Sequence, residues 1–475
     1  MRLLPVALLA TAFASVTAQT SLTPHQRLAR EVYSELISIN TADSVGSVTK
    51  AAEAMAKRFR AAGFPESDVQ LLIPPGKPTK GNLVVRLHGR GGPNTAKPIL
   101  LLAHLDVVAA RREEWPRDPF TLVEEGGYFL GRGTSDDKAM AAIFVANMLQ
   151  YKQQNWRPDR DIILALTADE EGGDSNGAEW LVKNHRAAID AAYALNEGGG
   201  GTLQGKGTDV KPLFHSIQAA EKVYTDFTLT ATNPGGHSSV PRPDNAIYEL
   251  ADALARLEHF TFPVELNATT RAFFEQTAKV EKPDVAAAMR AIAANPRDSA
   301  AAASLSCDPR YSSMLRTTCV PTRLSGGHAY NALPQTATAN VNCRMAPTSN
   351  VDAVRAAIVR VIADTGIKIS FTSGQRPDFP TSVPPIEPAL LAATTELTRK
   401  MWGDIPVVPT MSTGATDGHY LRAAGIPTYG VSGLFSLPGE SNAHGRDEKL
   451  RVKSYYDGLE FLDQLVRRLT GGVQP

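Results

Sequence analysis

The sequence predicts an α/β fold in which a mainly parallel β-sheet is flanked by helices and carries an inserted ferredoxin-like α+β domain. Short apolar runs alternate with helical stretches along the first 200 residues, a pattern typical of strands that are buried on both faces between helices. Between about residues 212 and 374 the pattern changes, and strands and helices follow in the order of a ferredoxin-like unit. The length of 475 residues also exceeds one hydrophobic core, so two domains are expected.

The large domain is expected to comprise residues 19–211 and 375–475. Its first helices are predicted at residues 28–37 and 48–62, where apolar residues recur with helical spacing, and Gly63 follows as a stop signal. The expected strands are residues 82–87, 99–108, 162–168 and 191–195, separated by helices at residues 138–153 and 178–185. Residues 381–402 are predicted to be helical, and residues 410–433 return to the large domain.

The inserted domain is expected at residues 212–374. Its predicted strands are residues 223–231, 337–344 and 367–372, and its predicted helices are residues 245–257 and 351–363. An alanine-rich stretch at residues 285–305 is interpreted as an additional helical excursion.

The N-terminus is interpreted as a cleavable signal peptide, residues 1–18. Arg2 precedes an apolar stretch at residues 3–14, and small residues follow at Val16 and Ala18. The stretch is shorter than the roughly 20 apolar residues of a membrane span. We therefore expect an exported protein, periplasmic or secreted, without stable membrane association after cleavage.

Charge and cysteine content exclude several classes of function. The 49 basic and 49 acidic residues balance, so no net field favours nucleic acid or an anionic membrane, and a small-molecule or peptide substrate is expected. The cysteines, Cys307, Cys319 and Cys343, are compatible with one disulfide. A Cys307–Cys319 bridge would close a short loop, and three buried thiols are an equal alternative. None of the cysteines forms a CxxC pair, which disfavours a thiolate zinc site.

Polar residues end several predicted strands. His104 and Asp106 close the apolar run 99–106. On a strand this spacing places both side chains on one face, so His104 could bind a metal while Asp106 accepts its other ring N–H. A hydrogen-bonded structural histidine is the simpler alternative. Glu170 and Glu171 likewise follow the strand at residues 162–168, and Glu197 follows the strand at 191–195. Open α/β sheets bind ligands at this edge.

Adjacent buried glutamates are costly unless a cation or a proton-transfer role retains them, although a solvated pair in a loop is an alternative. Asp136 lies in a glycine-rich turn before a helix, where a plain helix cap is the alternative, and His444 lies in a loop before the last helix. Two histidines with several carboxylates suit zinc or a related ion. The excess of carboxylates over histidines suggests two metals that share a carboxylate.

The ordered motifs HLD, GRGTSDDK, ADEEGG, NEGGG and HGRDE resemble those of the di-zinc metallopeptidase family of aminoacylase, carboxypeptidase S and glutamate carboxypeptidase. Trp115 and Pro119-Phe120 look like the carboxypeptidase S branch. The resemblance implies two Zn²⁺ per subunit, which Co²⁺ or Mn²⁺ can replace. The implied roles are a bridging ligand for Asp136, ligands of one zinc for His104 and Glu197, ligands of the other for Glu171 and His444, the general base for Glu170, and orientation of His104 for Asp106.

The same resemblance extends to the inserted domain, which it identifies as a lid or dimerisation domain. It implies that His237 polarises the scissile carbonyl, often in the active site of a partner subunit, so a homodimer is expected. It also implies that Asn331, Arg344 and Gly414 hold the substrate carboxylate, a role for which the guanidinium fork is suited. A turn histidine, a turn asparagine and a surface ion pair are the structural alternatives. His419 departs from the family, because relatives often carry arginine there.

The expected activity is hydrolysis of an amide bond next to a free carboxylate, in a small peptide or an N-acyl amino acid. Two cations lower the pKa of a shared water, and Glu170 can take its proton and pass it to the leaving nitrogen. One alternative is an amidohydrolase that acts on a non-peptide metabolite. A binding protein on a degenerate scaffold would lack the base or a ligand, and the sequence retains all of them.

Overall fold

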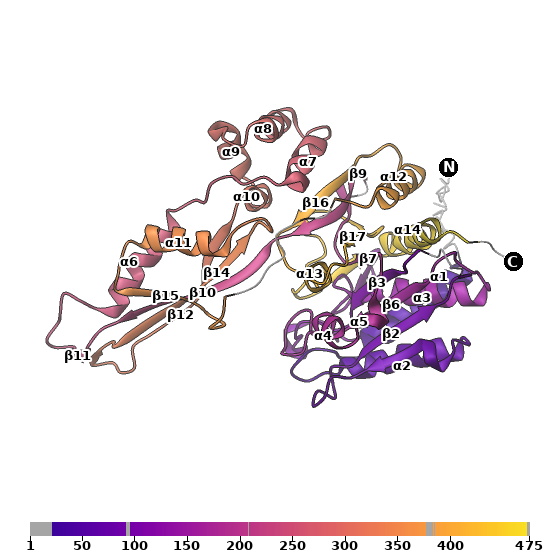
Figure 1. Ribbon diagram of the computed structural model, residues 1–475, viewed down its shortest axis with the longest axis horizontal. Coiled ribbons are helices and arrows are strands. Elements are labelled where there is room, and N and C mark those ends of the chain that lie inside the picture. Colours follow the sequence, from indigo (N-terminus) through magenta and orange to yellow (C-terminus); the bar gives the residue numbers. More distant parts are fainter. Residues whose placement is uncertain (1–20, 92–95, 208, 377–382, 384, 473–475) are drawn as a thin grey trace, which may run out of the picture.

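The computed structural model describes residues 21–91, 96–207, 209–376, 383 and 385–472. A large mixed sheet packs between helices, and a smaller antiparallel sheet extends away from it (Figure 1). This arrangement confirms the predicted α/β fold with an inserted α+β unit. The predicted signal peptide lies outside the described residues.

The centre of the large sheet is parallel. β3 (Ile99–His104) lies between β6 (Ile162–Thr167) and β7 (Tyr193–Asn196), and β17 (Thr428–Gly430) follows β7. All residues of β3 and β6 are buried, because alternate side chains enter separate cores on the two faces. The outer strands are β1 (Val69–Leu72), β2 (Asn82–Leu87), β8 (Gly200–Lys206), β9 (Asp209–Glu221), β16 (Val407–Ser412) and β18 (Phe435–Ser436), with several antiparallel pairs.

Helices cover both faces of this sheet. The larger core involves α1 (Pro24–Ser38), α2 (Val48–Ala61), α3 (Lys138–Gln153), α12 (Pro388–Trp402) and α14 (Val452–Thr470). The opposite core involves α4 (Gly177–Asn184), α5 (Arg186–Ile189) and α13 (Gly418–Ala423). α12 begins at Pro388, later than the predicted start at 381, and residues 381, 382 and 384 lie outside the described part of the chain.

One predicted strand is shorter than expected. The strand predicted at residues 99–108 ends at His104, so Asp106 lies beyond it. The argument that both side chains share a strand face is therefore wrong. Directly after the strand, the backbone N–H of Leu105 still donates to the carbonyl of Thr167 at 2.9 Å.

The small sheet has the ferredoxin-like order. Its strands β10 (Val223–Thr232), β12 (Thr318–Gly326), β14 (Thr336–Met345) and β15 (Ile367–Phe371) are antiparallel in the order β12-β14-β10-β15. α6 (Ala246–Glu258) and α11 (Val351–Ile362) contribute to its core. The edge strand β12 was not predicted, because its residues from Val320 onward are exposed and Pro321 interrupts the pattern.

The disulfide differs from the expected pair. It joins Cys319 to Cys343, which lie directly opposite each other in β12 and β14 with their Cα atoms 4.1 Å apart. Cys307 is exposed and free. The alternative of three buried thiols is therefore also wrong, and the error follows from the missed strand, whose register determines the partner of Cys319.

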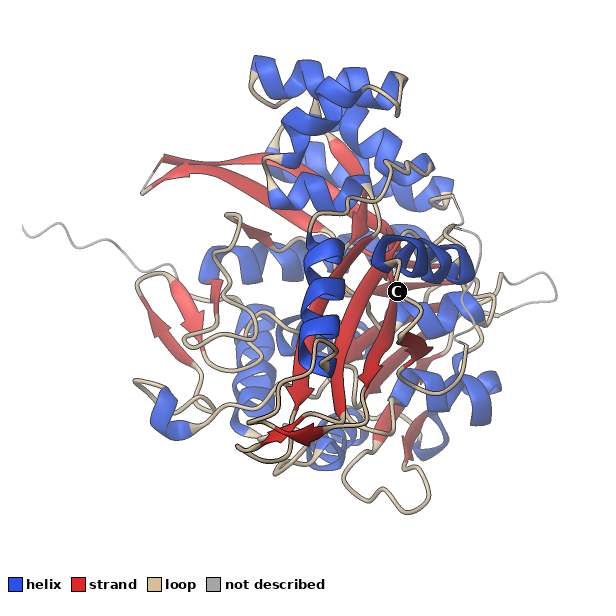
Figure 2. Ribbon diagram, turned by 90° about the vertical axis from the view of Figure 1, so that its left-hand side faces the viewer, coloured by secondary structure: helices blue, strands red, loops and turns tan. Residues whose placement is uncertain are grey.

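The alanine-rich excursion is larger than expected. It forms α7 (Ala268–Thr277), α8 (Pro283–Ala294), α9 (Ser299–Ser306) and α10 (Pro309–Leu315), which lie beside the junction of the two sheets (Figures 1 and 2). Their core includes Phe274 and Met289 and also Val408 of β16 in the large sheet. The predicted domain boundary between residues 211 and 212 falls inside β9.

A single residue, Lys222, separates β9 from β10. Its side chain is buried, and Nζ donates to the carbonyl of Arg316 at 2.7 Å. This contact fixes the short connection between the two sheets to the end of the helical excursion. Among the described helices, none is long and apolar enough to cross a membrane.

His215 of β9 is buried beneath α12 and α14. Its ring lies 5.4 Å from that of Trp402 and 5.0 Å from that of Phe461, and Nε2 donates to the carbonyl of Ser432 at 2.6 Å. Burial lowers the pKa of His215 from 6.5 to about 4. The folded chain therefore keeps this ring neutral at pH values where the unfolded chain protonates it.

This difference predicts an acid-dependent loss of stability. The His215 contribution is complete above pH 6.5 and falls as the pH decreases toward 4, by about 3 kcal/mol in total. The variant His215→Gln should start less stable at pH 8 because its packing is poorer. Its urea midpoint, followed by tryptophan fluorescence, should then decline less steeply than that of the wild type between pH 6.5 and 4. If the urea midpoints of the variant and the wild type declined equally between pH 6.5 and 4, His215 would not be the source of the acid-dependent loss of stability.

Candidate active site

Polar side chains from three adjacent parallel strands meet at one edge of the large sheet. His104 ends β3, Glu170 and Glu171 follow β6, and Glu197 follows β7. Because these strands are parallel neighbours, their carboxyl ends lie side by side. The turn before α3 brings Asp136 to the same edge, and His444 approaches from the loop before β19 (Lys449–Arg451).

Asp136 lies between the two histidines. Its Oδ1 is 3.1 Å from Nε2 of His104, and its Oδ2 is 3.2 Å from Nε2 of His444. Each histidine also faces a second carboxylate: Glu197 Oε2 is 3.9 Å from His104 Nε2, and Glu171 Oε1 is 2.9 Å from His444 Nε2. The arrangement therefore has two halves, each with one imidazole and one glutamate, joined by one aspartate.

The ligand atoms are close enough to share metal ions. Those of His104, Asp136 and Glu171 lie within 4.8 Å of one another, and so do those of His104, Glu170 and Glu197. Imidazole nitrogens and carboxylate oxygens without thiolates suit zinc or a similar divalent ion. Glu170 thus lies within the cluster, beside the residues that the sequence interpretation places on the metals.

The electrostatics of the cluster also fit cations. Glu197 Oε1 is buried without a hydrogen-bond partner in the described part of the chain. Burial raises the pKa of Glu197 well above its ordinary value, and the nearby carboxylates of Glu170, Asp137 and Asp136 add to this effect. Burial alone would lower the pKa of His104, but the carboxylates of Asp106 and Asp136 raise it. The protein groups alone therefore do not compensate a charged carboxylate at Glu197.

The surroundings of Glu170 favour its protonated form. Burial raises its pKa to about 8, and the carboxylates of Asp417, Glu171 and Asp106 act in the same direction, against His104. The hydrogen bonds of Asp136 and Glu171 to His444 raise the pKa of that histidine to about 10. A divalent cation at the cluster would lower both values, because it favours the deprotonated forms.

Asp106 holds both His104 and the glutamate pair. Its Oδ1 and Oδ2 accept the backbone N–H groups of Glu170 at 3.1 Å and Glu171 at 3.0 Å. Nδ1 of His104 is 3.1 Å from the carbonyl oxygen of Asp106 and 3.6 Å from its carboxylate. The contact expected from the sequence thus involves mainly the backbone of Asp106, while its carboxylate fixes the loop of Glu170.

Glu448 was missed as a functional residue, although it lies in the last motif. Its buried carboxylate pairs with the buried Arg132 at 2.7 Å and accepts the backbone N–H groups of Ser135 at 2.7 Å and Asp136 at 3.2 Å. These bonds hold the turn that carries Asp136, in place of the simple helix cap considered from the sequence. The acidic pair at the end of the HGRDE motif was the available signal.

Two further buried acids support the Glu170 loop. Asp417 accepts from Oγ1 of Thr167 and Nδ2 of Asn176, each at 2.7 Å. Asp169 has a left-handed backbone conformation, with φ of 57°, and pairs with the buried Lys80 at 2.5 Å. Nothing local in the sequence indicates these contacts, because each joins distant segments.

The residues predicted to hold the substrate do not all lie at the cluster. His237 and Asn331 are exposed in or beside the two-stranded sheet of β11 (Gly236–His237) and β13 (Ala332–Leu333), and β11 lies at the end of the inserted domain far from the large sheet (Figure 1). Arg344 stacks over Tyr224, with Cζ 4.7 Å from the ring centroid. Gly414 is exposed after β16. The predicted metal ligands, Glu170 and Asp106 therefore converge, whereas His237 and Asn331 lie elsewhere.

Comparison with known proteins agrees with this site. Residues 100–468 match the model of peptidase family M20/M25/M40. The chain is 28% identical over 394 residues to a probable carboxypeptidase S-like protein of Dictyostelium discoideum, covering 80% of this chain and 73% of that protein. It is 26% identical over 393 residues to an N-fatty-acyl-amino acid synthase/hydrolase of Homo sapiens, covering 81% and 77%.

Solved structures share the fold. An M20 family metallo-carboxypeptidase from Sulfolobus solfataricus aligns with a TM-score of 0.68 at 18% identity, over 92% of this chain and 98% of that one. Human carnosine dipeptidase 1 aligns with a TM-score of 0.64 at 15% identity, over 94% and 96%. The family match includes every residue of the cluster, from His104 to His444. The chain therefore belongs to peptidase family M20/M25/M40 and is a metallo-hydrolase.

Proposed function

We propose that this metallo-hydrolase uses two metal ions to cleave an amide bond next to a free carboxylate, in a dipeptide or an N-acyl amino acid. The observation that carries the proposal is Asp136, which directs one carboxylate oxygen to each of two histidines beside Glu170. The relatives and structural neighbours include a carboxypeptidase S-like protein, an N-fatty-acyl-amino acid hydrolase and a dipeptidase. Peptide and N-acyl amino acid substrates of these kinds share an amide bond close to a carboxylate.

We assign His104 and Glu197 to one ion, Glu171 and His444 to the other, and Asp136 to both. Zinc suits these ligands, and Co²⁺ or Mn²⁺ can replace it. The bound ions supply a water of lowered pKa and an electrophile for the scissile carbonyl. Glu170 then accepts a proton from the attacking water and donates it to the leaving nitrogen. Asp106 keeps Glu170 in place through its backbone N–H.

We place the substrate carboxylate near Gly414 and Arg344. The guanidinium of Arg344 can grip two carboxylate oxygens, and the exposed loop at Gly414 can offer backbone N–H groups. His419 follows that loop, and burial lowers the pKa of its ring. A neutral imidazole there would bind an anion less strongly than the arginine that relatives often carry, so the grip on the carboxylate depends mainly on Arg344.

We also propose that the protein is exported after removal of residues 1–18. The disulfide between Cys319 and Cys343 supports this location, because disulfides persist in oxidising compartments. Mass spectrometry of the protein recovered from the periplasm or medium checks the cleavage site.

A homodimer would explain the position of His237. The two-stranded β11–β13 sheet lies far from the large sheet of its own chain (Figure 1), so we propose that it completes the active site of a second subunit. The neighbouring surface supports an interface, since Val240, Tyr248 and Tyr330 are large apolar residues with exposures of 69%, 65% and 111%. Asn331 would enter the partner's site with His237.

Metal removal tests the class of reaction. Dialysis against a chelator should abolish hydrolysis of dipeptides and N-acyl amino acids, and Zn²⁺ should restore it, because the cluster cannot otherwise lower the pKa of water. The measurement pairs metal content with rate. Full activity in protein that contains no metal would contradict the proposal.

Substitutions separate the base from the bridging ligand. Glu170→Gln should lower kcat by about 10²- to 10⁴-fold and retain the metal content of the wild type. Asp136→Asn should lose metal, because it weakens both halves of the cluster. Glu53→Gln, at an exposed position on α2, serves as the control and should change neither property. Equal metal loss in the Glu170 and Asp136 variants would show that the roles are misassigned.

Subunit complementation tests the dimer. A purified heterodimer of one Glu170→Gln subunit and one His237→Ala subunit should regain about half of wild-type activity, because one site then combines an intact Glu170 with the partner's His237. Each variant homodimer should remain nearly inactive. A heterodimer as inactive as both homodimers would place His237 in the active site of its own chain, and a monomer in sedimentation would exclude the dimer.

A further inference from the structure

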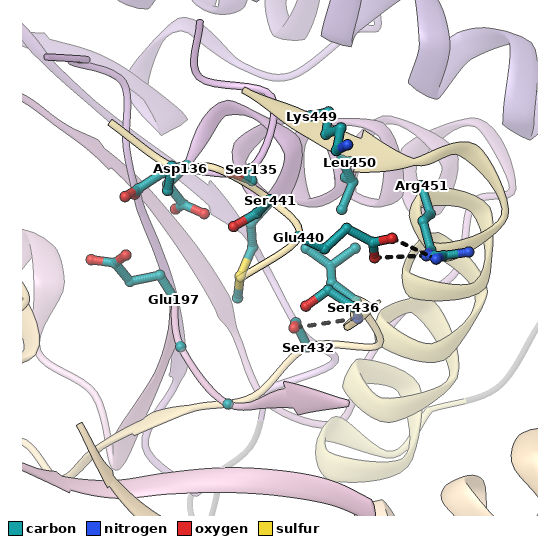
Figure 3. Close-up of a pocket in the computed structure, with 16 residues that line it drawn as sticks. Ser135, Asp136, Glu197, Ser432, Ser436, Glu440, Ser441, Lys449, Leu450 and Arg451 are labelled. Carbon is teal, nitrogen blue, oxygen red and sulfur yellow. Dashed lines mark hydrogen bonds and ion pairs between the residues drawn. The ribbon is translucent and has the colours of Figure 1, made fainter. Parts of the chain in front are cut away.

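A cavity of about 240 Å³ begins at Asp136 and Glu197 of the cluster, and residues of the inserted domain do not line it. Asp136 and Glu197 form its inner end, and Figure 3 shows the ion pair of Glu440 and Arg451 on the opposite side. Its walls come from the start of α3, residues 432–441 and β19. We propose that this cavity binds the acyl-side substituent of the substrate and selects a compact group with a hydrogen-bonding end over a long hydrocarbon chain.

The position of the cavity assigns it to the acyl side, an assignment that rests on the proposed function. In the proposed function the scissile amide lies at the cluster, and Arg344 and Gly414 hold the carboxylate side of the substrate. Neither residue lines the cavity, whose walls belong to other segments. A substrate held at the cluster by its carbonyl can therefore place only its other end in this cavity.

The volume limits the substituent. A cavity of about 150 Å³ accommodates one benzene ring, so a cavity of about 240 Å³ accommodates a side chain the size of glutamine or leucine. The extended chain of a fatty acid exceeds this volume, and the part beyond it would have to leave through the open side of the cavity. Met140, Leu434 and Leu450 form an apolar part of the wall, which suits the methylene groups of such a side chain.

The remaining wall is polar. Ser432, Ser436 and Ser441 line the cavity. Glu440 accepts from Nε of Arg451 at 2.7 Å and from Oη of Tyr128 at 2.6 Å. A hydrocarbon chain pressed against these groups would remove their water and return no hydrogen bond. An amide or hydroxyl at the end of a short side chain would replace the hydrogen bonds of that water. The cavity should therefore prefer a short side chain with a polar end to a hydrocarbon chain.

The test narrows the cavity at one position. Ser436 lies on β18 opposite Thr202 of β8, and Thr202 does not line the cavity. Ser436→Leu fills the space, and Thr202→Leu adds a similar bulk to the same strand pair. The substrates share a C-terminal leucine: alanyl-leucine, glutaminyl-leucine and N-hexadecanoyl-leucine. The measured quantity is kcat/KM for each substrate with metal-loaded enzyme.

We expect the wild type to prefer glutaminyl-leucine to N-hexadecanoyl-leucine by about ten-fold or more. Ser436→Leu should lower the ratio of glutaminyl-leucine to alanyl-leucine by a similar factor, Ser436→Val should lower it less, and Thr202→Leu should leave it unchanged. The valine variant keeps the test valid if the leucine variant does not fold.

A wild-type preference for N-hexadecanoyl-leucine would overturn the proposal, and so would equal changes of the ratio in the Ser436 and Thr202 variants. Failure of metal-loaded wild-type enzyme to cleave any of the three substrates would instead overturn the proposed function on which the subsite rests.

Discussion

The structure depends on the close approach of several carboxylates at one buried edge of the large sheet. Like charges at such distances repel strongly when water is excluded. The outer acids are compensated by the chain itself: Glu448 by Arg132, Asp169 by Lys80, and Asp417 by neutral donors. At the centre, one oxygen of Glu197 has no partner among the described residues. Residues of the chain thus compensate the acids around the site, whereas the acids at its centre require cations for compensation.

The fold supplies this arrangement from distant parts of the chain. Parallel strands deliver His104 and the glutamates, but Glu448, which holds the Asp136 turn, comes from near the C-terminus. The site therefore forms only when the last motif docks beside the first. The cavity next to Asp136 has the same dependence, since β19 forms one of its walls.

The sequence predicted the elements whose patterns are local. α3 has the predicted bounds, Lys138–Gln153, and the buried strands were found because apolar runs on both faces are distinctive. β12 was missed because an exposed edge strand has no apolar pattern, and the disulfide pairing was missed with it. Of the site, the convergence of the cluster was predictable from strand ends and motifs. The supporting contacts of Glu448 and Lys80 were not, because they depend on long-range packing.

The order of strands in the large sheet has a consequence for the synthesis of the protein. β17 lies between β7 and β9, although the whole inserted domain separates it from both of them in the sequence. All strands of the small sheet, by contrast, lie between Val223 and Phe371. As the chain leaves the ribosome, the small domain can complete its sheet first. The edges of β7 and β9 that pair with β17 stay unpaired until β17 has been synthesised. The cluster of candidate metal ligands is then among the last parts of the molecule to assemble.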